Sequence, residues 1–227
     1  CPSSLSNVYE KYILEGMTLS CNDNGRGYLA LDNYDKIMGK VEWADSLVIG
    51  PGLGLEKDTI SLVAKLVNTV DKPIVLDADG LASYPFLKCS LDNLVITPHL
   101  GEFSKMLNIE KFFLLNNFIK IVNNFLKDFE GVAVIKHVPA CVITGQKMSL
   151  NSTGNSGLAT AGSGDVLSGV IASFISQNMD TYDACRLSSY FHGLAADNQI
   201  KYKGIRGLIA SDLPLEIAKV INEYENL

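Results

Sequence analysis

Short runs of apolar residues alternate along the chain with segments rich in glycine, proline and acidic residues. Four of these runs occupy residues 46–49, 73–76, 94–97 and 132–135. Near-continuous apolar runs of this length are typical of strands that are buried on both faces of a sheet. Between them, apolar residues recur at helical spacing over 60–67 and 118–129. The alternation predicts an α/β protein with three layers, in which helices cover both faces of a mostly parallel central sheet.

Polar or glycine-rich sequence follows each predicted strand directly. The segments are 50–54, 77–80, 98–102 and Lys136. In open parallel sheets, ligands bind beyond the carboxyl ends of the strands, so these segments are expected to line one cleft. Simpler interpretations remain open for the individual side chains. Asp77 and Asp79 are more often turn residues, and a lysine such as Lys136 is more often a surface cation. His99 could instead be a solvated loop residue, and Glu102 could cap a short helix.

A glycine-rich stretch at 151–169 follows a predicted hairpin over 141–151. It holds five glycines, and apolar residues at helical spacing follow it. We expect a helix that starts at Asp165, with the glycines just before its first unpaired N–H groups, where an anion binds readily. A phosphate-bearing ligand is the first interpretation. The alternative is a turn in which Asp165 only caps the helix.

Two further helices are expected towards the end of the chain. One spans roughly 182–199, and the other starts near Ser211, which is a plausible cap, with Pro214 in the first turn. His192 is expected to pack within its own helix. No repeat or linker interrupts residues 1–227, so we expect a single domain.

Composition narrows the possible functions. The chain has a net charge of −6 and lacks a long basic run, which argues against a nucleic-acid partner. No stretch approaches membrane-spanning length. The five cysteines are scattered and odd in number, so they indicate neither a disulfide framework nor a zinc site, and a reducing cytoplasm is the expected setting. The P-loop motif, the complete dinucleotide fingerprint and the G-x-S-x-G elbow do not occur.

The motifs taken together resemble one family. V-I-G-P-G-L-G (48–54), V-L-D-A-D-G-L (75–81), I-T-P-H-L-G-E-F (96–103) and V-I-K (134–136) precede the glycine-rich run, and Y-F-H-G-L-A-A-D (190–197) and A-S-D-L (210–213) follow it. This order resembles the ADP/ATP-dependent NAD(P)H-hydrate dehydratases, the YjeF C-terminal domain family, over about residues 40–227. The resemblance implies a ribokinase-like fold. It also implies repair of NADHX and NADPHX by phosphorylation of the hydrate hydroxyl and loss of phosphate, with Mg²⁺ and with ADP or ATP as co-substrate.

By the same resemblance, Asp165 would be the general base and would contact the hydrate together with Gly52, Gly54 and His99. Glu102 would act through Mg²⁺. The residues expected at the nucleotide are Lys136, Asn155, Gly162, Ser163 and Gly164, although Asn155 could serve only its own turn. ADP is the expected phosphate donor, because the T-P-H-x-G-E run at 97–102 is of the bacterial type.

The chain departs from the family at three points. Leu100 stands where the family usually has proline, and His137 stands where it has glycine, so the His137 side chain could crowd a nucleotide phosphate. The family also carries a leading βα segment of roughly sixty residues, by resemblance, that contacts the hydrate, and we expect it to be absent from residues 1–227. In many bacteria an epimerase domain comes first, so fusion or pairing with an epimerase is an open expectation, as is homo-oligomerisation.

Two other functions share the glycine-rich signature. One is a ribokinase-like kinase of a small alcohol such as a vitamin precursor, which uses the same G-x-G-D logic. The other is a nucleotide-binding remnant without catalysis. His99 and the P-H-x-G-E run favour the dehydratase.

Overall fold

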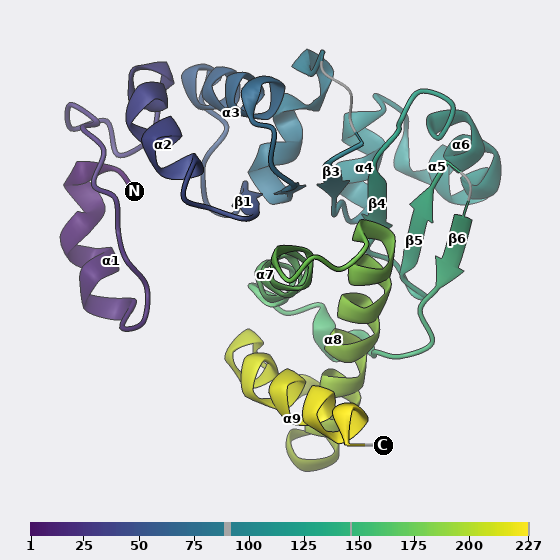
Figure 1. The fold of residues 1–227 in the computed structure, drawn as a ribbon. Coiled ribbons are helices and arrows are strands. Elements are labelled where there is room, and N and C mark those ends of the chain that lie inside the picture. Colours follow the sequence, from purple (N-terminus) through teal and green to yellow (C-terminus); the bar gives the residue numbers. More distant parts are fainter. Residues whose placement is uncertain (89–91, 146, 227) are drawn as a thin grey trace.

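A computed structural model describes residues 1–88, 92–145 and 147–226. Within these residues the chain forms three layers, with a central sheet between two groups of helices (Figure 1). The α/β/α architecture expected from the sequence is therefore confirmed. Cys89 lies outside the described residues, and the other four cysteines are free thiols.

The described strands form one sheet in the sequential order β1 to β6. Strands β1 to β4 are parallel, whereas β5 and β6 form an antiparallel hairpin beside β4. Their bounds are β1 (Leu47–Ile49), β2 (Ile74–Leu76), β3 (Leu94–Ile96), β4 (Val132–Ile135), β5 (Cys141–Thr144) and β6 (Lys147–Leu150). The four predicted apolar runs and the predicted hairpin thus all form strands.

Successive side chains of each strand point to opposite faces of the sheet, which produces two cores. Ile74, Leu76 and Ile96 pack in one core with the helices α3 to α6 and the 3₁₀ helix η3. Val75 and Val95 pack in the other core with α7 and α8. Because both faces are covered, the strands need apolar residues at every position, and the sequence supplies them.

The helices fall into two groups by layer. The first group comprises α3 (Lys57–Thr69), η3 (Ala78–Phe86), α4 (Leu100–Met106), α5 (Lys111–Asn116) and α6 (Phe118–Phe125). The second comprises α7 (Ser163–Ser176), α8 (Thr181–Lys203) and α9 (Leu213–Glu225), with the 3₁₀ turns η5 (Ile205–Gly207) and η6 (Ala210–Asp212) between α8 and α9. No helix among the described residues is both long enough and apolar enough to span a membrane.

Three predicted helix boundaries were wrong. The helix expected over 118–129 ends at Phe125, because Lys127 and Asp128 bond to carbonyls three residues back and the helix gives way to a turn. Helix α7 begins at Ser163 rather than Asp165. Helix α9 begins at Leu213, and the residue at its cap position is Asp212 rather than Ser211.

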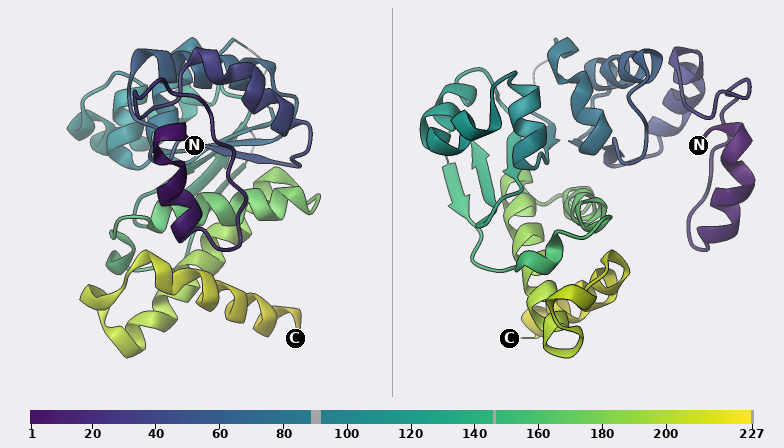
Figure 2. Two further views of the ribbon diagram at one scale, coloured as in Figure 1. Left: turned by 90° about the vertical axis from the view of Figure 1, so that its left-hand side faces the viewer. Right: turned by 180° about the vertical axis from the view of Figure 1, so that it is seen from behind.

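The N-terminal segment lies at one side of the molecule, as two further views show (Figure 2). It comprises η1 (Ser3–Leu5), α1 (Ser6–Tyr12), η2 (Leu31–Asn33) and α2 (Tyr34–Val41). The buried carboxylate of Asp23 holds the N-terminal segment together. It accepts hydrogen bonds from the Ser3 and Ser4 hydroxyls and from the Gly27 N–H. These bonds lower the pKa of Asp23. Strand β1 remains at the edge of the sheet.

The loops after β1 and β2 touch through their backbones. Gly50 has a φ of 137°, and a Cβ added there would lie 1.7 Å from the Asp77 carbonyl oxygen. Only glycine satisfies both conditions. This contact sets the distance between the two loops, and therefore the position of the side chains that the β2 loop carries.

We expect Gly50→Ala to destabilise the fold by about 3 kcal/mol or more, because neither backbone can move without disturbing the sheet. Gly39→Ala is the matched control: Gly39 lies in α2, and a Cβ there would meet nothing within 4 Å. It should leave stability unchanged or raise it by about 0.5–1 kcal/mol. Urea unfolding of both variants measures the difference, and equal midpoints would contradict the steric argument.

Candidate functional site

The glycine-rich stretch ends in a sharp turn that begins α7. Gly162 occupies the cap position with a left-handed φ of 85°, and Ser163, Gly164 and Asp165 form the first turn of the helix. The first N–H groups of a helix have no intrahelical acceptor, and they favour an anion. Asp165 is not the cap, so the interpretation of this residue as a mere N-cap is wrong.

The Asp165 side chain is exposed, yet its pKa is raised. Partial removal of water by the surrounding atoms is the largest cause, and the negative charge of Asp77 adds to it. The positive charge of Lys136 opposes both. A carboxylate with a raised pKa is a better proton acceptor than an ordinary one.

Asp77 lies at the centre of a buried cluster at the end of β2. Its side chain is 1 % exposed. One carboxylate oxygen accepts a bond of 2.7 Å from the Lys136 ammonium, and the other accepts one of 2.7 Å from the Ser168 hydroxyl. The sequence interpretation of Asp77 as a turn residue was therefore incomplete, although Asp77 does also cap η3 through the Ala78 N–H.

Lys136 reaches the start of α7 from the end of β4. A Cβ added to Gly164 would lie 3.2 Å from the Lys136 nitrogen and 3.7 Å from a carboxylate oxygen of Asp77. The ion pair thus packs directly against the first turn of the helix. The glycine leaves the room for this approach, and the ammonium lies beside the backbone of the turn.

His99 and Glu102 bracket the start of α4. The His99 ring accepts hydrogen bonds from the Gly101 and Glu102 N–H groups, and a Glu102 carboxylate oxygen accepts one from the His99 N–H. This capping box confirms the simpler interpretation of Glu102. The backbone of His99 forms a bridge with that of Lys136, so the start of α4 adjoins the buried cluster.

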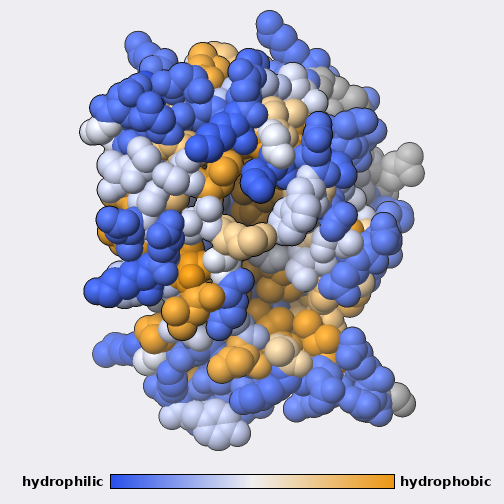
Figure 3. All heavy atoms as spheres, turned by 60° about the vertical axis from the view of Figure 1, so that its left-hand side comes forward, coloured by the Kyte–Doolittle hydropathy of each residue, from blue (hydrophilic) through white to orange (hydrophobic). Residues whose placement is uncertain are grey.

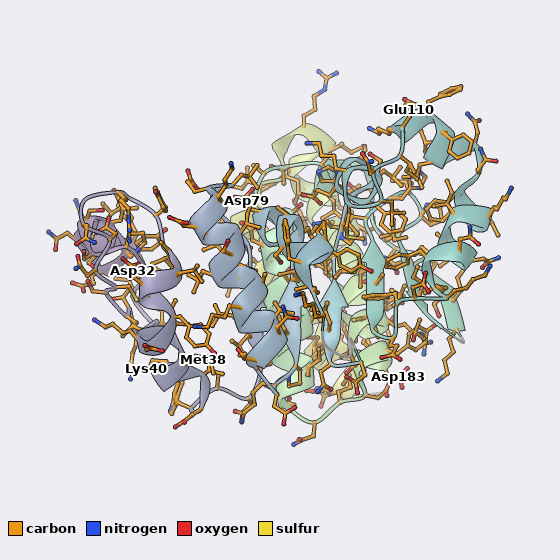
Figure 4. The ribbon with its side chains drawn as sticks, turned by 90° about the horizontal axis from the view of Figure 1, so that it is seen from above. Asp32, Met38, Lys40, Asp79, Glu110 and Asp183 are labelled. Atoms are coloured by element: carbon orange, nitrogen blue, oxygen red, sulfur yellow. The ribbon has the colours of Figure 1, made fainter. Side chains whose placement is uncertain are left out.

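The loop that contains Gly52 and Gly54 is tied to the end of β2. The Gly54 N–H donates to the Asp79 carboxylate at 2.9 Å. Figure 4 shows Asp79 in the central part of the molecule, whereas Asp32 and Lys40 lie at one side and Glu110 at the other. The loops after β1 and β2 therefore form one unit beside the cluster.

Helix α8 packs against the glycine-rich stretch and forms hydrogen bonds with it. The Asp197 carboxylate accepts hydrogen bonds from the Gly154 N–H and the Asn155 side chain, both at 2.8 Å. Asn155 also accepts a bond from the Gly157 N–H, so it organises its own turn. A Cβ on Gly193 would lie 2.3 Å from the Thr153 hydroxyl, so the stretch packs tightly on the helix.

His192, also on α8, contacts the start of α7. Its Nε2 lies 2.9 Å from the Ser163 carbonyl oxygen, and because a carbonyl only accepts, the neutral ring donates from that nitrogen. The expectation that His192 packs only within its own helix was wrong. Burial lowers the pKa of His192 to about 4.

His137 follows Lys136, and its side chain is exposed. The ring lies beside that of Phe118, with the two centroids 6.4 Å apart. That this ring crowds a nucleotide phosphate stays a prediction.

The described residues contain no group of three or more histidine, cysteine or acidic side chains that could enclose a metal ion. Mg²⁺ usually takes one or two protein carboxylates and fills its shell with substrate phosphates and water. Glu102, which is partly exposed beside the cluster, fits that kind of donor set.

The structure thus brings Lys136 against Gly164, and the charges of Asp77 and Lys136 act on the neighbouring Asp165. The backbone bridge between His99 and Lys136 places the start of α4, with Glu102, beside them. Gly52 and Gly54 connect to the same loops through Asp79. The sequence reasoning missed Ser168, Asp197 and the role of His192. Ser168 lies one turn after Asp165, and this spacing was the available signal.

The fold first defines a class. A ribokinase-like superfamily protein from Enterococcus faecalis matches with a TM-score of 0.72 at 21% identity, over 86% of this chain and 69% of its own. The ADP/ATP-dependent NAD(P)H-hydrate dehydratase of Bacillus subtilis, crystallised with ATP and Mg²⁺, matches with a TM-score of 0.69 at 26% identity, over 79% and 65%. The fold is ribokinase-like.

Sequence comparison then identifies the family. The pattern that defines the NAD(P)H-hydrate dehydratases matches residues 8–219, so the chain belongs to that family. The match includes the N-terminal segment, to which the sequence reasoning assigned no site. The bifunctional NAD(P)H-hydrate repair enzyme Nnr of Moorella thermoacetica is 33% identical over 93% of this chain. The chain spans 41% of that relative and 36% of its Escherichia coli counterpart, which is also 33% identical.

We expect the buried His192 to make stability depend on pH. Its pKa is lowered on folding to about 4, so the stabilisation is present above pH 6.5 and is lost as the pH falls towards 4. Between pH 7.5 and 5 the loss should be about 2 kcal/mol, before most carboxylates titrate. Urea unfolding at several pH values measures this loss. His192→Gln removes the titration and should flatten the curve; an unchanged slope would contradict the assignment.

Proposed function

We propose that the chain catalyses nucleotide-dependent dehydration of (6S)-NADHX and NADPHX to NADH and NADPH. The observation that carries the proposal is the position of Asp165 in the first turn of α7, beside the Lys136–Asp77 ion pair. Such a site holds a base, a cation and backbone donors together, which suits phosphoryl transfer to a hydroxyl. Membership of the dehydratase family supports the choice of substrate.

In the proposed reaction, Asp165 accepts the proton of the hydrate hydroxyl while that oxygen attacks the terminal phosphorus of the nucleotide. The bond from phosphorus to the leaving nucleotide breaks, which releases ADP from ATP or AMP from ADP. The carbon–oxygen bond then breaks as the ring nitrogen donates its electron pair, and inorganic phosphate leaves. The resulting ring cation loses a proton to water from the carbon next to the one that carried the hydroxyl, which forms the new double bond of NADH or NADPH. The net change is loss of water from the hydrate at the expense of one phosphoanhydride bond.

The nucleotide would lie against the turn at Gly162, Ser163 and Gly164, with Lys136 beside its phosphates. Asn155 would contribute by ordering the loop that it shares with Asp197. The hydrate would lie towards Gly52, Gly54 and His99. Mg²⁺, held by nucleotide oxygens and Glu102, would neutralise charge on the phosphates.

Residues 1–227 are proposed to form a single dehydratase domain within a longer enzyme. In relatives that are named bifunctional, this chain corresponds to less than half of the length. A family-type leading βα segment would cover β1, whose Val48 is 39 % exposed.

Figure 3 shows hydrophobic residues gathered around a hollow in the middle of one face. An epimerase partner, self-association and a cytoplasmic location belong to the same proposal.

Turnover tests the proposal directly. NADHX incubated with the protein, Mg²⁺ and either nucleotide should regenerate the absorbance of NADH. A panel of vitamin-type alcohols with ATP tests the kinase alternative, in which phosphorylated alcohol would accumulate. Nucleotide binding without either product would instead favour a non-catalytic protein.

Asp165→Asn should lower turnover by about 10²–10⁴-fold, because the amide cannot accept the hydroxyl proton. The fold should survive, since the lost charge–dipole interaction is worth only about 0.3–1 kcal/mol. Activity of the parent should fall as the pH drops through the raised pKa of Asp165. Turnover and thermal melting are measured on one preparation. A normally folded variant with more than about a tenth of the activity would remove Asp165 from the mechanism.

We expect ADP to support faster turnover than ATP at equal concentration, from the bacterial-type sequence at 97–102. The specificity constants for the two nucleotides measure the preference. A tenfold preference for ATP would contradict this expectation and would leave the dehydratase proposal intact.

A further inference from the structure

We propose that Asp77 is a positioning residue, which holds the Lys136 ammonium and the first turn of α7 in the alignment that phosphoryl transfer needs. This inference rests on the proposed function. It assigns to the β2 loop a role that acts through two other residues and requires no contact between Asp77 and substrate.

The geometry assigns each carboxylate oxygen of Asp77 a separate task. Oδ1 accepts from the Lys136 nitrogen at 2.7 Å and from the Ala78 N–H at 2.8 Å. Oδ2 accepts from the Ser168 hydroxyl at 2.7 Å. One buried group therefore connects the ends of β2 and β4 with helix α7.

Lys136 retains the capacity to bind phosphate while Asp77 holds it. An ammonium has three donors, and Asp77 takes one of them. The Lys136 side chain is 23 % exposed and the Asp77 side chain is 1 % exposed, so the carboxylate lies deeper in the protein than the ammonium. The Lys136 nitrogen also lies 3.2 Å from the position of a Cβ built on Gly164, so the ammonium adjoins the first turn of α7.

The bond to Ser168 fixes the helix in the same frame. Ser168 is fully buried, and its hydroxyl also lies 3.4 Å from that of Thr97, at the end of β3. Asp165 lies three residues earlier, on the same side of α7. A shift of Ser168 along the helix axis would therefore carry Asp165 with it.

Two effects of removing the Asp77 charge oppose each other. Lys136 would lose its anchor, but its positive charge would no longer be neutralised and would attract phosphate more strongly. Coulomb attraction governs ground-state binding, whereas the reaction rate depends on alignment, for which a displacement of about 1 Å can cost about 100-fold. We therefore expect Asp77→Asn to lower kcat without raising the KM for nucleotide in proportion.

In steady-state kinetics, Asp77→Asn should lower kcat at least about tenfold while the KM for nucleotide stays within about threefold or falls. The acidic limb of the kcat profile should move to lower pH. Two charged groups shift the pKa of Asp165: Asp77 on the β2 loop raises it, and Lys136 after β4 lowers it. The variant removes the negative charge of Asp77 and leaves the positive charge of Lys136 without its ion-pair partner, so both changes lower the pKa of Asp165. A merely structural role would move neither the KM-against-kcat balance nor this limb.

A double-mutant cycle tests action through Lys136. In the Lys136→Met background, Asp77→Asn should lower kcat no further, and the double variant, with no unpaired buried charge, should melt higher than Asp77→Asn alone. Asp23→Asn is the matched control, because Asp23 is equally buried and bonds to two serines in the N-terminal segment. It should lower the melting temperature and leave kcat unchanged.

Crystal structures of the parent and of Asp77→Asn give a readout that does not depend on turnover. Lys136 should leave its place beside Gly164 in the variant. Three results would each overturn the inference. Lys136 could keep its position in the variant structure, kcat of Asp77→Asn could equal that of the parent, or the two substitutions could lower kcat independently in the double-mutant cycle. A parent protein without NADHX turnover, in which Lys136 still moves in the variant, would overturn the proposed function alone.

Discussion

The buried charge of Asp77 is the constraint on which the rest of the site depends. An ionised carboxylate removed from water is costly unless charged and hydrogen-bonding groups surround it. Asp77 is surrounded by Lys136, Ser168 and the Ala78 N–H, which come from three different parts of the chain. The strand ends and α7 must therefore meet in one arrangement, and that arrangement also places the glycine-rich turn.

Helix α8 provides the second half of this arrangement. Asp197 and His192 bond to opposite ends of the glycine-rich stretch, and Gly193 lets the stretch lie directly on the helix. A loop rich in glycine has little preference of its own for one conformation. Its shape is therefore imposed by α8, whose own position is fixed by packing against β4, β5, α7 and α9.

Most of the fold could be predicted from the sequence, because apolar runs and helical periodicity are local signals. The strands at 46–49, 73–76, 94–97 and 132–135 and the order of the layers followed from them. The helix end at Phe125 did not, because the apolar pattern continues to Phe129, which is buried without being helical. The motifs also indicated which loops converge, since the carboxyl ends of parallel strands share one edge.

The contacts inside the site could not be predicted in the same way. Nothing in the local sequence states that the Asp77 carboxylate turns towards Lys136, or that the His192 ring reaches the Ser163 carbonyl. These are contacts between residues that are distant in sequence, decided by how α7 and α8 seat on the sheet. The roles assigned to Asp165, His99, Glu102 and Asn155 remain predictions, although the structure identifies the hydrogen bonds that orient the last three.

The separation of the Asp77 partners along the chain has a consequence for folding. Lys136 lies 59 residues from Asp77, and Ser168 lies 91 residues away. Contacts this distant form slowly, because long stretches of chain must be ordered before they can close. During synthesis the strands β1 to β4 emerge before α7, so Asp77 lacks its hydroxyl partner until the glycine-rich stretch and the helix behind it have docked. The candidate site is thus completed late in folding, and a chain that stops short of α7 would lack both the site and the helices that cover one face of the sheet.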